Sequence, residues 1–127
     1  MPNLYKPYAF LGIGKGGDHD NYYLRFSPMC VKSFGSNNRA RVMKSTDGGY
    51  IVIEPYQEYD NRREMWTRGV KYQGSAVFIY VTGFVNSGFL NAELFGTGKK
   101  YKVKKDSKGR IYVCLNDVYE GDDGDGE

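Results

Sequence analysis

The sequence predicts an all-β, β-dominated fold: one small barrel with one to three short helices. Apolar and polar residues alternate with period 2 in several runs, and turn sequences rich in Gly, Asp and Ser separate these runs. A length of 127 residues fits a single domain that can bury a core. We expect an OB-like topology first and a barrel of two repeats second.

The clearest predicted element is a β-hairpin over residues 100–115, KYKVKKDSKGRIYVCL. Two alternating runs flank the turn sequence DSKG at residues 106–109. One face of this hairpin is aliphatic and is predicted to join the core. The other face shows cations and an aromatic ring: Lys102, Lys104, Arg110 and Tyr112.

The first part of the chain predicts two strands around a glycine-rich loop. Residues 4–13 alternate like a strand, with aromatic residues on one face and aliphatic residues on the other. Residues 12–20, GIGKGGDHD, are expected to be a loop whose glycines match the GxGxxG pattern of dinucleotide sites. That pattern needs a following helix, and residues 21–26, NYYLRF, alternate like a strand. We therefore reject a dinucleotide site.

A short helix is predicted after this strand, over residues 28–34. Ser27 suits the N-cap, Pro28 suits the first helical position, and Gly35 suits the position after the helix end. These signals predict about two helical turns. Pro55 is expected to end the hairpin that comes next.

That second hairpin, over residues 39–54, indicates an internal repeat. Val42 precedes Val103 by 61 positions, and Ile51 precedes Ile111 by 60, so the two hairpins differ by one residue in the turn. Each also follows a strand and a possible short helix that ends in glycine. The pattern predicts a strand–helix–hairpin repeat, and a coincidence between two ordinary hairpins is the alternative.

The middle of the chain holds the tryptophan and the most hydrophobic segment. Residues 56–71 are polar, carry Trp66 and are expected to be a long loop or a short helix. Residues 74–85, GSAVFIYVTGFV, are expected to form a central strand. One of its faces carries Phe78, Tyr80 and Phe84. This face is either a second core layer or a base-stacking platform, and we favour the core because large aromatic side chains are mostly buried.

The charge is unevenly distributed along the chain. The formal net charge is +3, but residues 120–127, EGDDGDGE, hold five acids and no Lys or Arg, which leaves +3 plus 5, or +8, on residues 1–119. We expect a barrel domain over residues 1–119 and a flexible acidic tail over residues 120–127. A basic body suggests a polyanionic ligand. The tail could mimic that ligand, dock a partner protein or simply aid solubility.

The cellular compartment is expected to be the cytoplasm, or the host cytoplasm if the protein is viral. No apolar run approaches the ~20 residues of a membrane span, and the N-terminus lacks the pattern of a signal peptide. Cys30 and Cys114 form no CxxC pair and are expected to be buried reduced thiols. A single histidine also argues against a zinc site, so we expect no metal and no cofactor.

Catalytic constellations are scarce, and we expect no enzyme. His19 lies between two Asp residues, but HD phosphohydrolases need several further His ligands that this chain lacks. Nothing in the sequence places a base beside either cysteine. Outside the tail, the acidic residues are scattered and lack the paired carboxylates of a hydrolase.

Binding is better supported, because twelve Tyr residues are more than a small core can satisfy. Single-stranded nucleic acid is held by cations for its phosphates and aromatic rings for its bases, at ~1–3 kcal/mol per stacked base. The residues we predict to contact nucleic acid are Tyr23, Arg25, Arg39, Arg41, Tyr50, Trp66, Tyr80, Lys102, Lys104, Arg110 and Tyr112.

Two resemblances follow from these segments. Residues 71–83, KYQGSAVFIYVTG, together with the acidic, glycine-rich tail, resemble small phage and bacterial single-stranded DNA-binding proteins, which implies an OB barrel and a tail that recruits partners. The tail ends in Glu127 and lacks the terminal Phe of the bacterial proteins. Separately, the strand–helix–hairpin units look like AbrB-type halves, which form a swapped-hairpin barrel and bind duplex DNA.

The function we expect is non-catalytic binding of single-stranded DNA, with RNA as an alternative ligand and a phage as a candidate source. An AbrB-like duplex DNA regulator is the second hypothesis. A protein-interaction or inhibitor module is the third, and a structural role in a virion is the fourth. The sequence leaves open a homo-oligomer and a protein partner for the tail.

Overall fold

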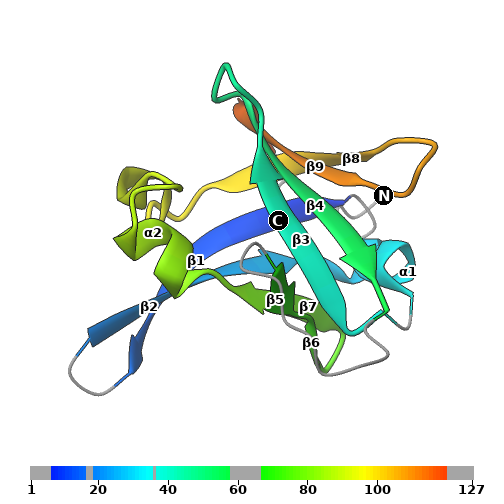
Figure 1. Cartoon of the computed structure of the whole chain (residues 1–127), viewed down its shortest axis with the longest axis horizontal. Helices are drawn as coiled ribbons and strands as arrows, with labels where there is room; N and C mark the ends of the chain where they lie inside the picture. The colour runs from blue at the N-terminus through cyan, green and yellow to red at the C-terminus, as the bar shows by residue number, and fades with distance from the viewer. Residues whose placement is uncertain (1–6, 17–18, 36, 58–66, 120–127) are drawn as a thin grey trace, which may run out of the picture.

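The computed structural model describes residues 7–16, 19–35, 37–57 and 67–119, which form a nearly closed antiparallel barrel (Figure 1). Strand accounts for 53% of the structure and helix for 15%, so the predicted β-dominated barrel is confirmed. Trp66 and the acidic tail lie outside the described residues.

The strands of the described residues form one sheet. They are β1 (Tyr8–Gly16), β2 (His19–Phe26), β3 (Arg39–Lys44), β4 (Tyr50–Tyr56), β5 (Thr67–Gly69), β6 (Lys71–Gln73), β7 (Ala76–Tyr80), β8 (Lys100–Lys105) and β9 (Ile111–Val118). The helical segments are short: η2 (Pro28–Cys30), α1 (Val31–Phe34), α2 (Thr82–Asn86) and η3 (Ala92–Leu94). Figure 1 shows α1 and α2 on opposite sides of the barrel.

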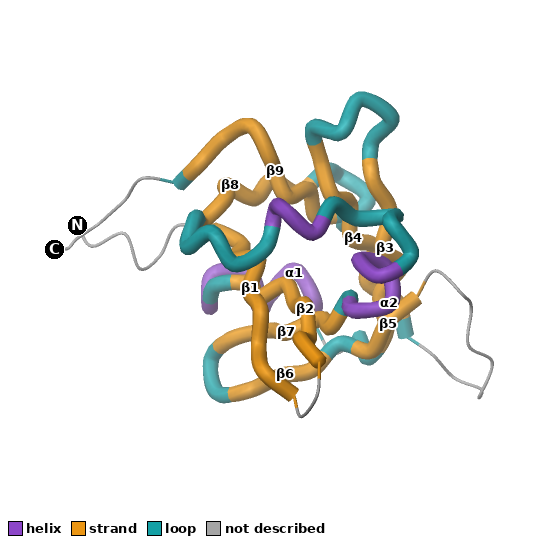
Figure 2. Tube along the Cα trace, turned by 90° about the vertical axis from the view of Figure 1, so that its left-hand side faces the viewer, coloured by secondary structure: helices purple, strands orange, loops and turns teal. Residues whose placement is uncertain are grey.

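Strand pairing brings the two ends of the sheet together. The order is β5-β3-β4-β9-β8-β1-β2-β7-β6, with every pair antiparallel. β5 pairs with β3 at one end, β6 pairs with β7 at the other, and only Val70 separates β5 from β6 in the chain. The chain therefore crosses from one edge strand to the other and closes the wall, as the tube in Figure 2 shows. Closure leaves little exposed sheet edge.

The core fills the barrel interior with one face of each longer strand, whereas β5 and β6 contribute no buried side chain among the described residues. Alternate residues of β2, β4, β7 and β9 are fully buried, such as Leu24, Ile51, Ile79 and Val113. Phe34 of α1 is also fully buried, and its ring packs against a core phenylalanine. The side chains between the buried residues face outward, as period-2 alternation requires. Only these outward-facing side chains of the strands can contact a ligand on the outside of the barrel.

The register supports the two-repeat topology rather than a five-stranded OB barrel. An offset of 60 carries Val52 to Tyr112, and these two residues face each other across β4 and β9. β2 and β7, the strands that precede the two hairpins, also pair with each other. When equivalent residues pair with each other in antiparallel strands, a two-fold axis passes between them. The two halves thus pair like subunits of a symmetric dimer, through opposite walls of one barrel.

Both predicted hairpins and the helix over residues 28–34 are confirmed, but several boundaries were wrong. The expected loop over residues 12–20 is largely strand, because β1 runs to Gly16 and β2 begins at His19. Pro55 does not end β4, which continues to Tyr56. β9 pairs with β4 only as far as Ile53, so a proline two residues later removes no bond from that pairing.

Local chemistry also differs at the helices. Ser27 makes no capping bond, and its Oγ instead accepts a hydrogen bond from the Tyr8 amide at 3.0 Å. Gly35 has φ +57° and ends α1 as predicted.

The expected strand over residues 74–85 ends at Tyr80, and α2 follows it. Both cysteines are buried and free, and burial raises the pKa of the Cys30 thiol.

Candidate nucleic-acid interface

Four aromatic rings cluster on the outer wall of β1, β2 and β7; we call them the aromatic platform: Phe10, Tyr23, Phe78 and Tyr80. Tyr23 lies at the centre, with ring centroids 5.6 Å from Phe78, 5.9 Å from Tyr80 and 6.5 Å from Phe10. The rings of Phe78 and Tyr80 are stacked at an interplanar angle of 19°. Tyr80 is 37% exposed, and the other three are half-buried against one another.

A glycine makes room for the central ring. Gly12 pairs with Tyr23 across β1 and β2, and the Tyr23 ring lies over the Gly12 backbone. A Cβ built at Gly12 would come within 2.3 Å of Tyr23 Cζ, whereas one at Gly14 would approach the same ring no closer than 3.9 Å. The first part of the GxGxxG pattern therefore serves ring packing.

Cations alternate with the platform rings in a single line across five strands. The register pairs Lys71 with Phe78, Phe78 with Arg25, Arg25 with Phe10, and Phe10 with Lys100. We call these five residues the cation–aromatic row. Four strand spacings of about 4.8 Å make it roughly 19 Å long. Successive strands across this wall thus carry a cation, an aromatic ring, a cation, an aromatic ring and a cation.

The row cations already lie over aromatic rings. Arg25 Cζ is 4.6 Å from the Phe10 centroid, Lys71 Nζ is 5.4 Å from the Tyr80 centroid, and Lys100 Nζ is 4.7 Å from the Tyr8 centroid. None of the three row cations forms an ion pair with a carboxylate of the described residues. No carboxylate of the described residues therefore competes with an anionic ligand for their charge.

The opposite wall, formed by β3, β4, β9 and the adjoining part of β8, differs in that most of its predicted binding cations form ion pairs. We call its outer side the hairpin face. Its rings include Tyr50 and Tyr112, which meet edge to face at 5.8 Å. Three of its cations are paired with acids: Arg41 with Glu54 at 3.5 Å, Lys102 with Asp117 at 3.3 Å, and Arg110 with Asp106 at 2.8 Å. Each pair must open or share its cation before a phosphate can bind.

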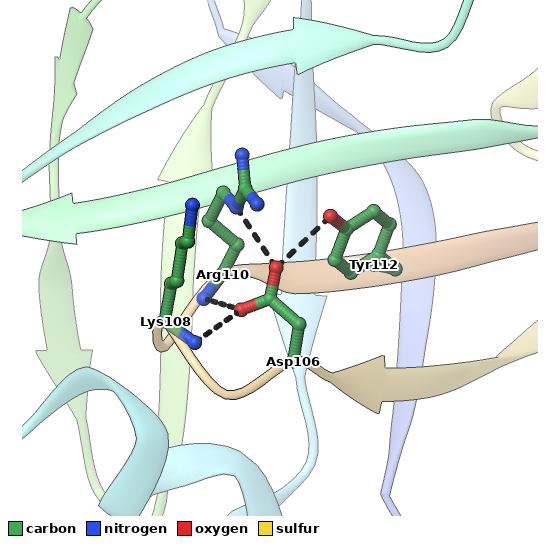
Figure 3. Close-up of polar contacts among 4 residues, drawn as sticks. All are labelled: Asp106, Lys108, Arg110 and Tyr112. Carbon is green, nitrogen blue, oxygen red and sulfur yellow. Dashed lines mark hydrogen bonds and ion pairs between the residues drawn. The ribbon is translucent and has the colours of Figure 1, made fainter.

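Asp106 organises the turn between β8 and β9 (Figure 3). Its Oδ1 accepts hydrogen bonds from the backbone amides of Lys108 and Arg110, and its Oδ2 accepts from Arg110 Nε and the Tyr112 hydroxyl. Partial desolvation raises the pKa of the carboxyl, but these four bonds outweigh it and lower the pKa to about 2. The predicted binding residues Arg110 and Tyr112 are therefore held in a structural network.

This network predicts a pH dependence of stability. The folded-state pKa of Asp106 is below the ordinary value of 3.8, so its contribution is present above about pH 4 and is lost as the pH falls towards about 2. Asp106→Asn should lower the urea midpoint at pH 7 and flatten the decline of stability between about pH 4 and 2. Asp117→Asn, which breaks a single exposed ion pair, is the matched control. Equal pH profiles for Asp106→Asn and the wild-type chain would contradict this role.

The structure separates the sequence-predicted residues into two groups. Tyr23, Arg25 and Tyr80 belong to the platform and row. The hairpin face holds Arg41, Tyr50, Lys102, Lys104, Arg110 and Tyr112. Arg39 lies on the same face at its edge, on β3 beside β5, and Trp66 is outside the described residues. The predicted residues therefore do not form one surface.

Sequence reasoning missed four members of the candidate interface: Phe10, Lys71, Phe78 and Lys100. The preference for burying the aromatic face of residues 74–85 was wrong for Phe78 and Tyr80, which face outward, and right for Phe84, which is 3% exposed on α2. Alternation within β1 predicted that Phe10 lies on the outward side of the strand, away from the aliphatic residues of the core. Only the strand register reveals which cations lie beside it.

Comparisons with known proteins supply no further identification. No family model matches the chain, and neither the curated proteins nor the solved structures contain a significant match. Among the described residues, no helix has the length and apolar character to cross a membrane. Those residues also include no group of three or more His, Cys, Asp or Glu arranged to hold a metal ion.

Proposed function

We propose that this protein binds single-stranded DNA without catalysis, with the aromatic platform stacking on bases and the row cations neutralising phosphates. The observation that carries the proposal is the Lys71–Phe78–Arg25–Phe10–Lys100 row. Every base offers a π-face, so stacking tolerates any sequence, while cations track the backbone. RNA offers the same two features and is the alternative ligand.

Titration of a fluorescently labelled oligo(dT) tests this function by anisotropy. We expect binding at low salt, an affinity that falls steeply as salt rises, and weaker binding of a duplex of equal length. Oligo(rU) measured beside oligo(dT) compares RNA with DNA. No binding of any probe at low salt would refute the proposal.

A duplex DNA regulator remains the second candidate because like strands of the two halves pair with each other, β4 with β9 and β2 with β7, as they would about a two-fold axis. Two-fold proteins suit palindromic duplex sites, since each half meets an equivalent half-site. The platform argues for single strands, because duplex bases are already stacked on each other. Stronger binding of duplex than of oligo(dT) at the same salt would favour this candidate.

Gly12→Ala should weaken oligo(dT) binding, because the new Cβ would push the Tyr23 ring out of the platform. Loss of one stacking site costs ~1–3 kcal/mol, or about 5- to 150-fold in affinity. Gly14→Ala is the matched control on the same strand and should bind within about twofold of wild type. Equal affinities for the two variants, with both folded by circular dichroism, would show that the Tyr23 position does not matter.

A further inference from the structure

The described chain ends beside one end of the cation–aromatic row. The Tyr119 amide donates a hydrogen bond to the Lys100 carbonyl at 2.6 Å, and the Tyr119 ring lies 5.4 Å from that of Tyr8. Lys100 Nζ lies over the same Tyr8 ring. The last described residue, Tyr119, therefore lies next to the last cation of the row.

The composition of the tail complements the row. Residues 120–127 carry five acids and no base. The row offers three cations that form no ion pair with the described carboxylates. At about 3.3 Å per residue, eight residues reach roughly 26 Å, which exceeds the length of about 19 Å estimated for the row. Length, charge and point of departure all suit binding along the row.

We propose that residues 120–127 occupy the cation–aromatic row in the free protein and compete there with nucleic acid. This inference rests on the proposed function and adds regulation of the same surface. A tethered segment acts at an effective concentration in the millimolar range, so even weak contacts suffice. The tail then excludes short or weak polyanions, whereas a long single strand displaces it by adding stacking that the tail, which has no aromatic residue, cannot supply.

The first arm of the test needs no nucleic acid. The full chain is compared by NMR with a variant of equal length whose tail is neutral, carrying E120Q, D122N, D123N, D125N and E127Q. We expect the signals of Arg25, Lys71 and Lys100 to shift, and those of Arg41 and Lys104 on the hairpin face to stay. Unchanged spectra, or equal shifts on both faces, would overturn the inference, since general electrostatics does not select one face.

The second arm measures oligo(dT) affinity of the same two proteins. The neutral-tail variant should bind about tenfold more tightly at low salt, with the difference shrinking as salt screens the tail. If both proteins bind equally well, the inference fails and the proposed function stands. If neither protein binds, the proposed function fails, and with it the claim of competition. A tail that serves only a protein partner would leave both the spectra and the affinities unchanged, which also overturns the inference.

Discussion

Replacing Tyr23 with alanine should lower the affinity for oligo(dT) by about 5- to 150-fold, the range given by ~1–3 kcal/mol per stacked base. Tyr23 contacts the other three rings of the platform, so its loss removes one stacking surface and loosens the others. Anisotropy titration at fixed salt measures the change.

Tyr50→Ala is the matched control for this variant. Tyr50 is also a half-buried strand tyrosine with an aromatic neighbour, Tyr112, but it lies on the hairpin face. We expect Tyr50→Ala to bind within about twofold of wild type once both variants are shown to be folded. A larger loss for Tyr50→Ala than for Tyr23→Ala would place the ligand on the wrong wall for our account.

The second large effect is expected from the row cations. A triple variant, Arg25→Gln with Lys71→Gln and Lys100→Gln, should reduce the slope of log affinity against log salt by about 2, because each phosphate contact to a single strand contributes about 0.7. The affinity at low salt should fall with it. Anisotropy titrations at several salt concentrations give the slope.

The comparison variant removes equal charge from the hairpin face through Arg41→Gln, Lys102→Gln and Arg110→Gln. These cations are paired with Glu54, Asp117 and Asp106, so they release fewer counterions on binding. Their removal should reduce the slope of log affinity against log salt by less than half of the reduction expected for the row triple variant. Equal slopes for the two triple variants would indicate diffuse attraction to a basic body instead of a defined row.

The sequence predicted local structure well where alternation and turn chemistry agreed. The hairpin over residues 100–115 combines both signals, and β8 and β9 lie within it and just beyond its end. The glycines of residues 12–20 predicted a loop wrongly, because a glycine such as Gly12 also suits close packing of a ring across a strand. The short strands β5 and β6 gave no alternation long enough to detect, yet they close the barrel.

The candidate interface was only partly predictable, and the reason is physical. Alternation states which residues of a strand face outward, but not which strand lies beside it. Tyr23 and Arg25 could be chosen from their own strand alone. Lys71 and Lys100 join them only because β6 and β8 flank the β1–β2–β7 wall. The hairpin cations Arg41, Lys102 and Arg110 are equally suitable by alternation, but each lies beside a carboxylate that only the structure reveals.

Photo-crosslinking tests the central claim most directly, because it reports which rings contact bases. An oligo(dT) containing 5-iodouracil would be irradiated with the full chain and the linked residues identified by mass spectrometry. We predict crosslinks to the platform, at Tyr23, Tyr80 and Phe78. Crosslinks confined to Tyr50 and Tyr112 would contradict the account.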